Sequence, residues 1–211
     1  MKNNTIQSPI FWGNHAPLST LVSAGLMIMA TSRLAFALAL TVALVWVNML
    51  TVLIVSVGKP ILPKKGLEIL RVFLASFFGS LYLLFSYFVN PFLAMEITFL
   101  ITLAPLYCIG SGICRRTADL DPEDAVLKAF LEALVLGSIL IALALIREPL
   151  GFGSLSFPGG PQGMAVLVFS GTLYFPVRVV AGASGGLLLL GYGLSLFRRF
   201  KARHSGGEAK Q

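Results

Sequence analysis

The chain has 211 residues, of which 56% are hydrophobic and only 12% are charged, and its mean hydropathy is +0.86. A soluble domain of this size cannot bury that much apolar surface, so the composition excludes a water-soluble globular protein and indicates a lipid bilayer as the solvent. The net charge of +7 does not indicate nucleic-acid binding, because the basic residues flank apolar segments and form no separate basic domain.

Long uncharged runs predict membrane-spanning helices. There are 25 uncharged residues between Arg33 and Lys59, and 24 between Arg71 and Glu96. At 1.5 Å of rise per residue, such a run covers roughly 36 Å, which is enough for a hydrocarbon core of about 30 Å. We therefore predict an all-α integral membrane protein with six transmembrane helices, over about 17–32, 34–57, 68–89, 92–114, 122–146 and 177–197.

Local signals refine these segments in chain order. The first is short and begins at Pro17, which favours a half-helix that starts inside the membrane. The fourth is predicted to be broken near Ala104-Pro105. The fifth has Asp121 as its predicted N-cap and Pro122 at its first helical position. Glycine and proline are dense over 147–161, so we expect an ordered but irregular loop there. Residues 164–176 are apolar but short, and we place them at the membrane interface.

A repeated motif predicts the domain organisation. Ala16-Pro17-Leu18 recurs 88 positions later as Ala104-Pro105-Leu106, and a serine follows six residues after each proline. Three apolar segments start from each copy, and an odd number of crossings forces the second copy to lie inverted in the bilayer. Inverted repeats with broken lead helices build sites at mid-membrane depth. We predict one polytopic domain over 1–197, with repeats at about 8–89 and 91–197, and a mobile basic cytoplasmic tail over 198–211.

Lysine and arginine predict the orientation, because cytoplasmic loops are enriched in them. With six crossings, one face carries thirteen of these residues, Lys2, Lys59, Lys64, Lys65, Arg71, Arg115, Arg116, Lys128, Arg198, Arg199, Lys201, Arg203 and Lys210, and the other carries three, Arg33, Arg147 and Arg178. This bias places both termini in the cytoplasm, as expected for a multi-pass protein of the bacterial cytoplasmic (inner) membrane.

Few ionisable residues fall inside the predicted spans, and such residues are the usual pointers to a transport path. Glu96 lies about one turn inside the fourth segment, and Glu132 lies in the fifth; both are candidates for an ion path. Lys128 precedes Glu132 by four residues, so a satisfied pair within one helix is the alternative for Glu132. Asn48 is a candidate for an interhelical hydrogen bond. The sequence offers no catalytic residues, so any enzymatic role would belong to a larger translocase or oxidoreductase complex.

Three stretches together resemble the Rnf/Nqr membrane-subunit family. They are Gly13-Asn14-His15-Ala16-Pro17-Leu18, then Ala104-Pro105-Leu106 through Arg116, and then Ile146-Arg147-Glu148-Pro149-Leu150-Gly151-Phe152-Gly153-Ser154-Leu155. The last is similar to the family's Arg-Glu-x-Leu-Gly-x-Gly-Thr-Leu run. The resemblance covers roughly 8–197, and the predicted cytoplasmic termini and basic tail are similar to the RnfE/NqrD-like branch of the family.

The resemblance implies a function. Family members are paired six-helix subunits of ion-translocating electron-transfer complexes, in which a homologous sister subunit of opposite orientation lies across a pseudo-twofold axis. Each subunit supplies two cysteines, and the four thiolates hold a [2Fe–2S] cluster in mid-membrane. Electrons pass through it between flavin-carrying and iron–sulfur subunits, and sodium or proton movement is coupled to that transfer.

The sequence departs from the family at the cluster ligands. The resemblance places the half-helix motif at Ala16, Pro17, Pro105 and Ser111, where the family has cysteine in place of Ala16 and Ser111. Alanine cannot ligate iron and a serine alkoxide is a poor substitute, so no metal ligand is expected at the family positions. Cys108 or Cys114 would supply a ligand only after a shift in register. Two alternatives stay open: a cofactor-free small-molecule carrier on this scaffold, and a purely structural membrane subunit.

Overall fold

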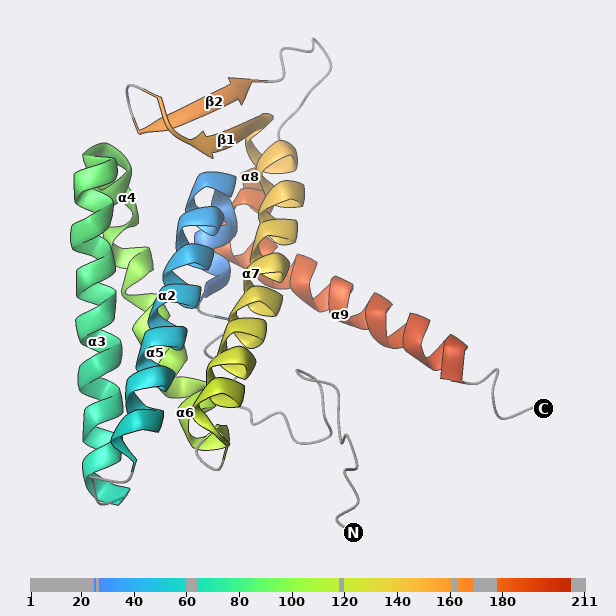
Figure 1. Ribbon diagram of the computed structural model, residues 1–211. Coiled ribbons are helices and arrows are strands. Elements are labelled where there is room, and N and C mark those ends of the chain that lie inside the picture. The colour runs from blue at the N-terminus through green and yellow to red at the C-terminus, as the bar shows by residue number, and fades with distance from the viewer. Residues whose placement is uncertain are drawn as a thin grey trace.

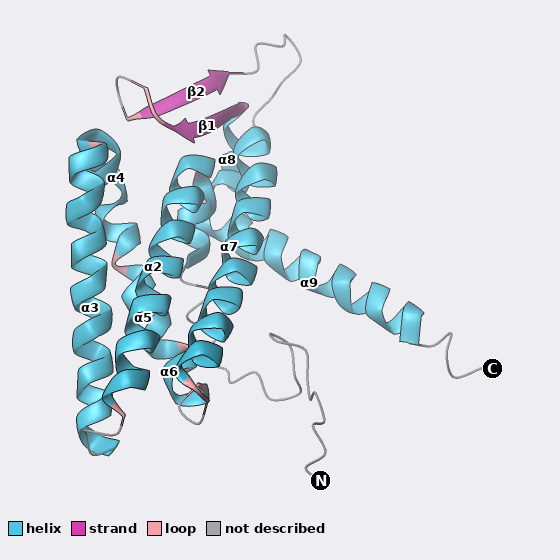
Figure 2. Ribbon diagram, in the orientation of Figure 1, coloured by secondary structure: helices cyan, strands magenta, loops and turns pink. Residues whose placement is uncertain are grey.

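The computed structural model describes residues 25, 27–59, 64–117, 120–160, 163–168 and 178–205, and these are mostly helical (Figure 1, Figure 2). The elements in chain order are the 3-10 helix η1 (Ile28–Ser32), the helices α2 (Leu34–Gly58), α3 (Lys64–Val89), α4 (Pro91–Ile101), α5 (Leu103–Gly110), α6 (Ile113–Arg116) and α7 (Pro122–Phe152), the strands β1 (Ser154–Pro158) and β2 (Met164–Val168), and the helices α8 (Arg178–Ala181) and α9 (Ala183–Ser205).

Within the described part of the chain, four helical segments are long and apolar enough to cross a membrane, which confirms the membrane-type helical architecture. They are α2, the part of α3 over Ile69–Val89, α4 and α5 together over Pro91–Gly110, and α7. They correspond to the second to fifth predicted segments. Of the first predicted segment, 17–24 lie outside the described residues, and the described part ends in η1 instead of a regular α-helix.

The helices α2 and α7 form the closest pair of the bundle. Small residues make this approach possible: a Cβ added at Gly137 of α7 would lie 2.2 Å from Thr41 Cγ2 of α2. Thr41 Oγ1 donates to Ala37 O at 2.7 Å, so its hydroxyl is satisfied within its own helix. Close backbone packing through small residues is the usual way in which membrane helices associate, because lipid supplies no hydrophobic drive between them.

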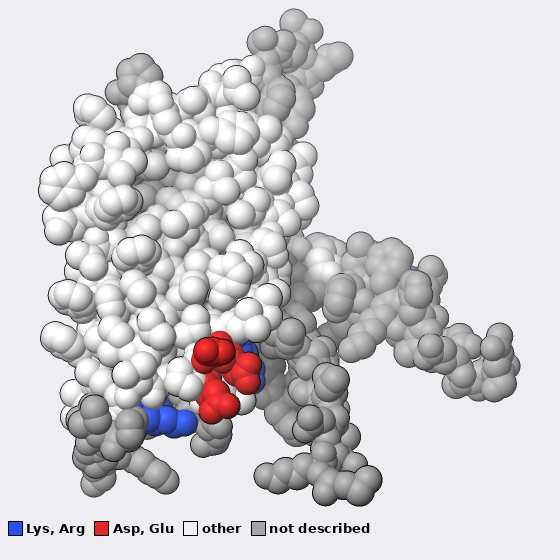
Figure 3. All heavy atoms as spheres, viewed as in Figure 1, with Lys and Arg blue, Asp and Glu red and all other residues white. Residues whose placement is uncertain are grey.

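One face of helix α3 packs against this pair, and the opposite face of α3 is exposed. Only 22% of its apolar window is buried, compared with 50% for α2. Tyr82 Oη donates to Ala39 O of α2 at 2.9 Å and ties the two helices together. Figure 3 shows a face almost free of charge, on which the described acidic and basic side chains gather at one end. An uncharged band above a charged end is the surface expected of a protein in a bilayer.

The break predicted in the fourth segment is present and lies at Thr102. The helix α4 ends at Ile101 and α5 begins at Leu103. Pro105 explains the position, because proline has no N–H to donate and its ring clashes with the carbonyl four residues earlier, which is that of Ile101. A second interruption follows at Ser111 and Gly112, where Gly112 has a φ of 67° that glycine adopts most readily.

The prediction of an irregular loop over 147–161 is wrong. The helix α7 continues through Pro149 to Phe152 and ends at Gly153 in the left-handed conformation (φ 65°), whose N–H donates to Pro149 O at 2.9 Å. The strand β1 then pairs antiparallel with β2, with Ser154 opposite Val168. Contacts from other elements hold this extension in place, and the glycine and proline content gave no sign of them.

Two helix ends also differ from expectation. Asp121 is the N-cap residue of α7, but its side chain makes no capping hydrogen bond. The last helix was predicted over 177–197; α9 starts at Ala183 after the short α8, and it continues to Ser205. Residues 198–205 are thus helical instead of a mobile tail, because no glycine or proline interrupts Phe197 to His204. Figure 1 shows α9 leaving the bundle beyond its first turns.

Candidate functional site

A buried polar cluster lies where α2, α5, α6 and α7 meet, beside the second interruption. Its members come from α2, from α5, from the segment around the turn at Gly112 and from α7. They are Thr51 of α2, Tyr107 and Cys108 of α5, Ser111, Cys114 and Arg116 at and after the turn, and Glu132 of α7. All of these side chains are buried except that of Arg116, which is 36% exposed.

The centre of this cluster is an ion pair between the buried Glu132 and the partly exposed Arg116. Glu132 is 2% exposed, and its Oε1 accepts from Arg116 Nη2 at 2.7 Å and from Tyr107 Oη at 3.3 Å. The same Arg116 nitrogen donates to Ser111 O at 2.9 Å, so the arginine joins the turn to α7. The alternative in which Glu132 pairs with Lys128 of its own helix is therefore wrong, because the partner is Arg116 at the end of α6.

The two cysteines of the chain meet next to this pair. Cys108 and Cys114 are both free and buried, and their thiols are within hydrogen-bonding reach of each other. Ser111, between them in sequence, is 1% exposed and donates its hydroxyl to Cys108 O at 3.3 Å. The hydroxyl of Ser111, the position at which a cluster ligand was considered, is thus hydrogen-bonded to the backbone of α5.

Two polar side chains of α2, those of Asn48 and Thr51, are 0% exposed. The amide nitrogen and oxygen of Asn48 have no hydrogen-bond partner among the described residues, whereas Thr51 Oγ1 lies beside the thiol of Cys108. Leaving a buried polar group unpaired costs about 1–3 kcal/mol. The expected interhelical hydrogen bond of Asn48 is therefore wrong, and Thr51 gave no signal in the sequence beyond its spacing of three from Asn48.

A second polar group, the Arg147–Glu148 anchor, lies at the opposite end of α7. Arg147 is 1% exposed and donates through Nε to Val180 O at 2.9 Å and through Nη2 to Gly182 O at 2.8 Å. Its Nη1 donates to Ile28 O at 2.8 Å and also to the hydroxyl of Thr31. One guanidinium thus joins α7 to η1 and to the α8–α9 junction.

Glu148 accepts a hydrogen bond from the first residue of α2. It is 1% exposed, and its Oε2 accepts from the backbone N–H of Leu34 at 2.7 Å. Ser156 of β1 accepts from the next amide, that of Ala35, at 3.3 Å. The first N–H groups of a helix have no partner within it, and its N-terminus favours negative charge. The anchor therefore satisfies the buried start of α2 from two other elements.

From the sequence, Arg147 was expected only as one of the charges that set the orientation, and Glu148 had no expected role. Two adjacent opposite charges at the end of an apolar helix were the available signal. Their partners are backbone groups of η1, α2, α8 and the α8–α9 junction. Backbone partners have no sequence signature, so the role could not be predicted.

The structure brings some of the predicted site residues together and separates others. Ser111, Cys108 and Glu132 share the buried polar cluster. Pro105 is buried against α3, where a Cβ at Gly79 would lie 2.5 Å from its ring. Glu96 lies apart on the exposed face of α4. The predicted positions Ala16 and Pro17 lie outside the described residues.

The donor set at the family's cluster positions does not fit thiolate ligation. Ala16 has no donor atom, and the hydroxyl of Ser111 is bonded to the backbone. Within the described ranges, no three side chains of the His, Cys, Asp or Glu type come together. No protein-family model matches the chain, and no curated protein matches it. The resemblance to the Rnf/Nqr membrane subunits thus rests on the residues of its three motifs.

Proposed function

We propose that this chain is a membrane subunit of an Rnf/Nqr-like ion-translocating electron-transfer complex, in which it forms part of the cation path. The observation that carries the proposal is Glu132, a carboxylate only 2% exposed in the apolar helix α7, which pairs at 2.7 Å with Arg116, whose side chain is 36% exposed. Ionisable groups buried within membrane helices are expensive and occur mainly where a protein moves ions or protons. Glu132 also lies beside a twice-interrupted helical segment, the arrangement on which mid-membrane sites are built.

The role proposed for this chain is to couple cation movement to electron transfer. No step of this role passes through an iron–sulfur cluster held by Ala16 and Ser111. Glu132 is the charge-bearing group, Arg116 and Tyr107 hold its carboxylate, and Ser111 fixes Arg116 through its carbonyl. A change in this hydrogen-bond set would change whether the carboxylate can take a cation or proton. In the complex, the sister subunit and the flavin-carrying and iron–sulfur subunits would carry the electrons.

The proposed topology has six crossings in the bacterial inner membrane, with both termini cytoplasmic. Support comes from the ends of the described helices: the end of α2, the start of α3, α6 and the start of α7 all lie at one end of the bundle (Figure 1). That end is the one with the charged side chains in Figure 3. The first and last predicted segments would complete two inverted three-helix repeats.

One observation favours a second candidate, a cofactor-free carrier of a small polar solute. The unpaired amide of Asn48 and the hydroxyl of Thr51 could hydrogen-bond such a solute inside the bundle. The structural-subunit alternative makes a different prediction, since a passive scaffold would tolerate loss of the Glu132 charge.

The deciding experiment separates electron transfer from ion movement. The whole complex is reconstituted in proteoliposomes, and the rates of electron transfer and of cation uptake are measured with Glu132→Gln, which keeps the shape of the side chain. We expect cation uptake per electron to fall at least about tenfold, because a neutral amide cannot carry the charge. Glu123→Gln is the matched control, since Glu123 lies on the same helix but is exposed at its start.

The paired variant Glu132→Gln/Arg116→Gln checks that the result is not loss of folding, because it leaves no uncompensated charge. An unchanged ratio of cations to electrons in folded Glu132→Gln would refute the ion-path role and favour the scaffold. Solute uptake by the subunit alone, abolished by Asn48→Leu, would favour the carrier.

A further inference from the structure

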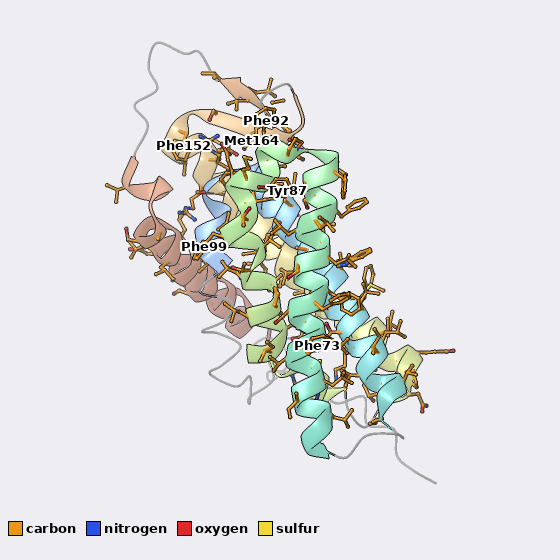
Figure 4. The ribbon with its side chains drawn as sticks, turned by 90° about the vertical axis from the view of Figure 1, so that its left-hand side faces the viewer. Phe73, Tyr87, Phe92, Phe99, Phe152 and Met164 are labelled. Atoms are coloured by element: carbon orange, nitrogen blue, oxygen red, sulfur yellow. The ribbon has the colours of Figure 1, made fainter. Side chains whose placement is uncertain are left out.

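The outer face of α4 and α5 carries a continuous exposed stripe, which we call the α4 stripe. It consists of Phe92, Met95, Glu96, Phe99, Leu106 and Ile109. In α4, Phe92, Glu96 and Phe99 follow one another at four and three residues with Met95 beside Glu96, and in α5 Leu106 and Ile109 are three apart, so each set lies on one side of its helix. Thr102, between the two sets, is exposed as well. Phe92 and Phe99 mark this stripe in Figure 4, beside the neighbouring helix α3.

Glu96 is the exception in this stripe. It lies five residues after Pro91, so it is about 7.5 Å inside a helical span whose 20 residues match a hydrocarbon core of about 30 Å. Its neighbours Met95 and Phe99 are 64% and 66% exposed, so apolar side chains surround the carboxylate on the outside of the protein. Lipid tails offer no hydrogen-bond donor, and charged residues in membrane spans face protein or water.

The exposed face of α3 differs from the α4 stripe because it carries no charged residue. It exposes Phe73, Phe77, Phe85 and Phe88 as strongly as α4 exposes its aromatic residues. No charged residue occurs from Val72 to Val89. Lipid tails are suitable neighbours for such an uncharged face, whereas they offer no partner for the Glu96 carboxylate in the α4 stripe.

We propose that the α4 stripe is the docking face for a transmembrane helix of another protein, which presents a lysine or arginine at the depth of Glu96. Charge complementarity selects this partner. In a symmetric pair formed by two copies of this chain through the same face, Glu96 would meet Glu96, and the stripe contains no basic residue to compensate. The inference goes beyond the electron-transfer function, because it requires only that α4 and α5 span a membrane.

The test is site-specific photo-crosslinking in the membranes of cells that make the full set of native proteins. A benzophenone amino acid replaces Phe99 in the stripe or Phe85 on α3, which are 66% and 64% exposed and so form a matched pair. We expect a protein adduct from position 99 and only lipid adducts from position 85. Mass spectrometry of the adduct should place the crosslink in an apolar helix that carries a lysine or arginine.

Charge variants give the second readout. Glu96→Gln should lower the yield from position 99 about tenfold or more, because it leaves the partner's cation buried and unpaired. Met95→Gln, an equally exposed polar change, should lower it far less. Because Glu96 is exposed, both variants should fold, which thermal denaturation would verify. Equal lipid labelling at positions 99 and 85, a crosslink to a second copy or to this chain, a partner helix without a basic residue, or no response to Glu96→Gln would each overturn the proposal.

Discussion

Replacing Arg147 by lysine is the most direct test of the Arg147–Glu148 anchor. The change keeps the positive charge and much of the length of the side chain, but it replaces a planar fork of five donors with a single ammonium. Four of the acceptors that the guanidinium reaches fall into two groups, Ile28 O and Thr31 Oγ1 on one side and Val180 O and Gly182 O on the other. One ammonium at the tip of a lysine cannot serve both groups.

The expected loss of folding stability can be worked out from the acceptors that the lysine no longer reaches. Two buried acceptors would lose their donor, and an unsatisfied buried group costs about 1–3 kcal/mol, so we expect a destabilisation of roughly 3 kcal/mol. For a chain of this size, this corresponds to a fall in Tm of about 6–12 °C. The assay is thermal denaturation of the purified protein in detergent or nanodiscs, followed by size-exclusion chromatography.

Arg33→Lys is the matched control for this exchange. Arg33 is half-buried and lies 5.9 Å and 5.8 Å from the ring centroids of Phe36 and Phe152. Such cation–π contacts contribute about 0.5–1 kcal/mol at exposed sites, so the fall in Tm should stay below about 4 °C. If Arg147→Lys and Arg33→Lys melt at the same temperature, the anchor does not hold the elements together as argued.

Three further changes test the packing and the buried amide of Asn48. Gly137→Ala should lower Tm by several degrees, because the new Cβ would meet Thr41 Cγ2 at 2.2 Å, and adding Thr41→Ala should restore part of the loss. Gly79→Ala should likewise lower Tm, through a contact of 2.5 Å with the ring of Pro105; melting at the wild-type temperature would contradict the close approach of α3 and α5. Asn48→Leu should keep or raise stability by about 1 kcal/mol, because the unpaired amide is unfavourable for folding; a large loss of stability would show that the amide is paired in the membrane.

The sequence alone was sufficient to predict the features that depend on residues close together in the chain. Hydropathy and the spacing of charges predicted α2, α3, the α4–α5 segment and α7, because a bilayer of fixed thickness requires about 20 apolar residues per crossing. Pro105 predicted a break within a few residues of its position, since the missing N–H and the steric clash act on the preceding turn. The start of α7 at Pro122 also followed from local preference.

The tertiary structure alone decided which polar groups meet. Glu132 has Lys128 four residues away but pairs with Arg116, which lies at the end of α6 beyond the turn at Gly112. The residues after Ile146 continue as helix and hairpin because Arg147 and Glu148 bind backbone groups of distant elements. Composition and periodicity describe one element at a time, and neither records the backbone N–H and C=O groups that another element leaves unpaired.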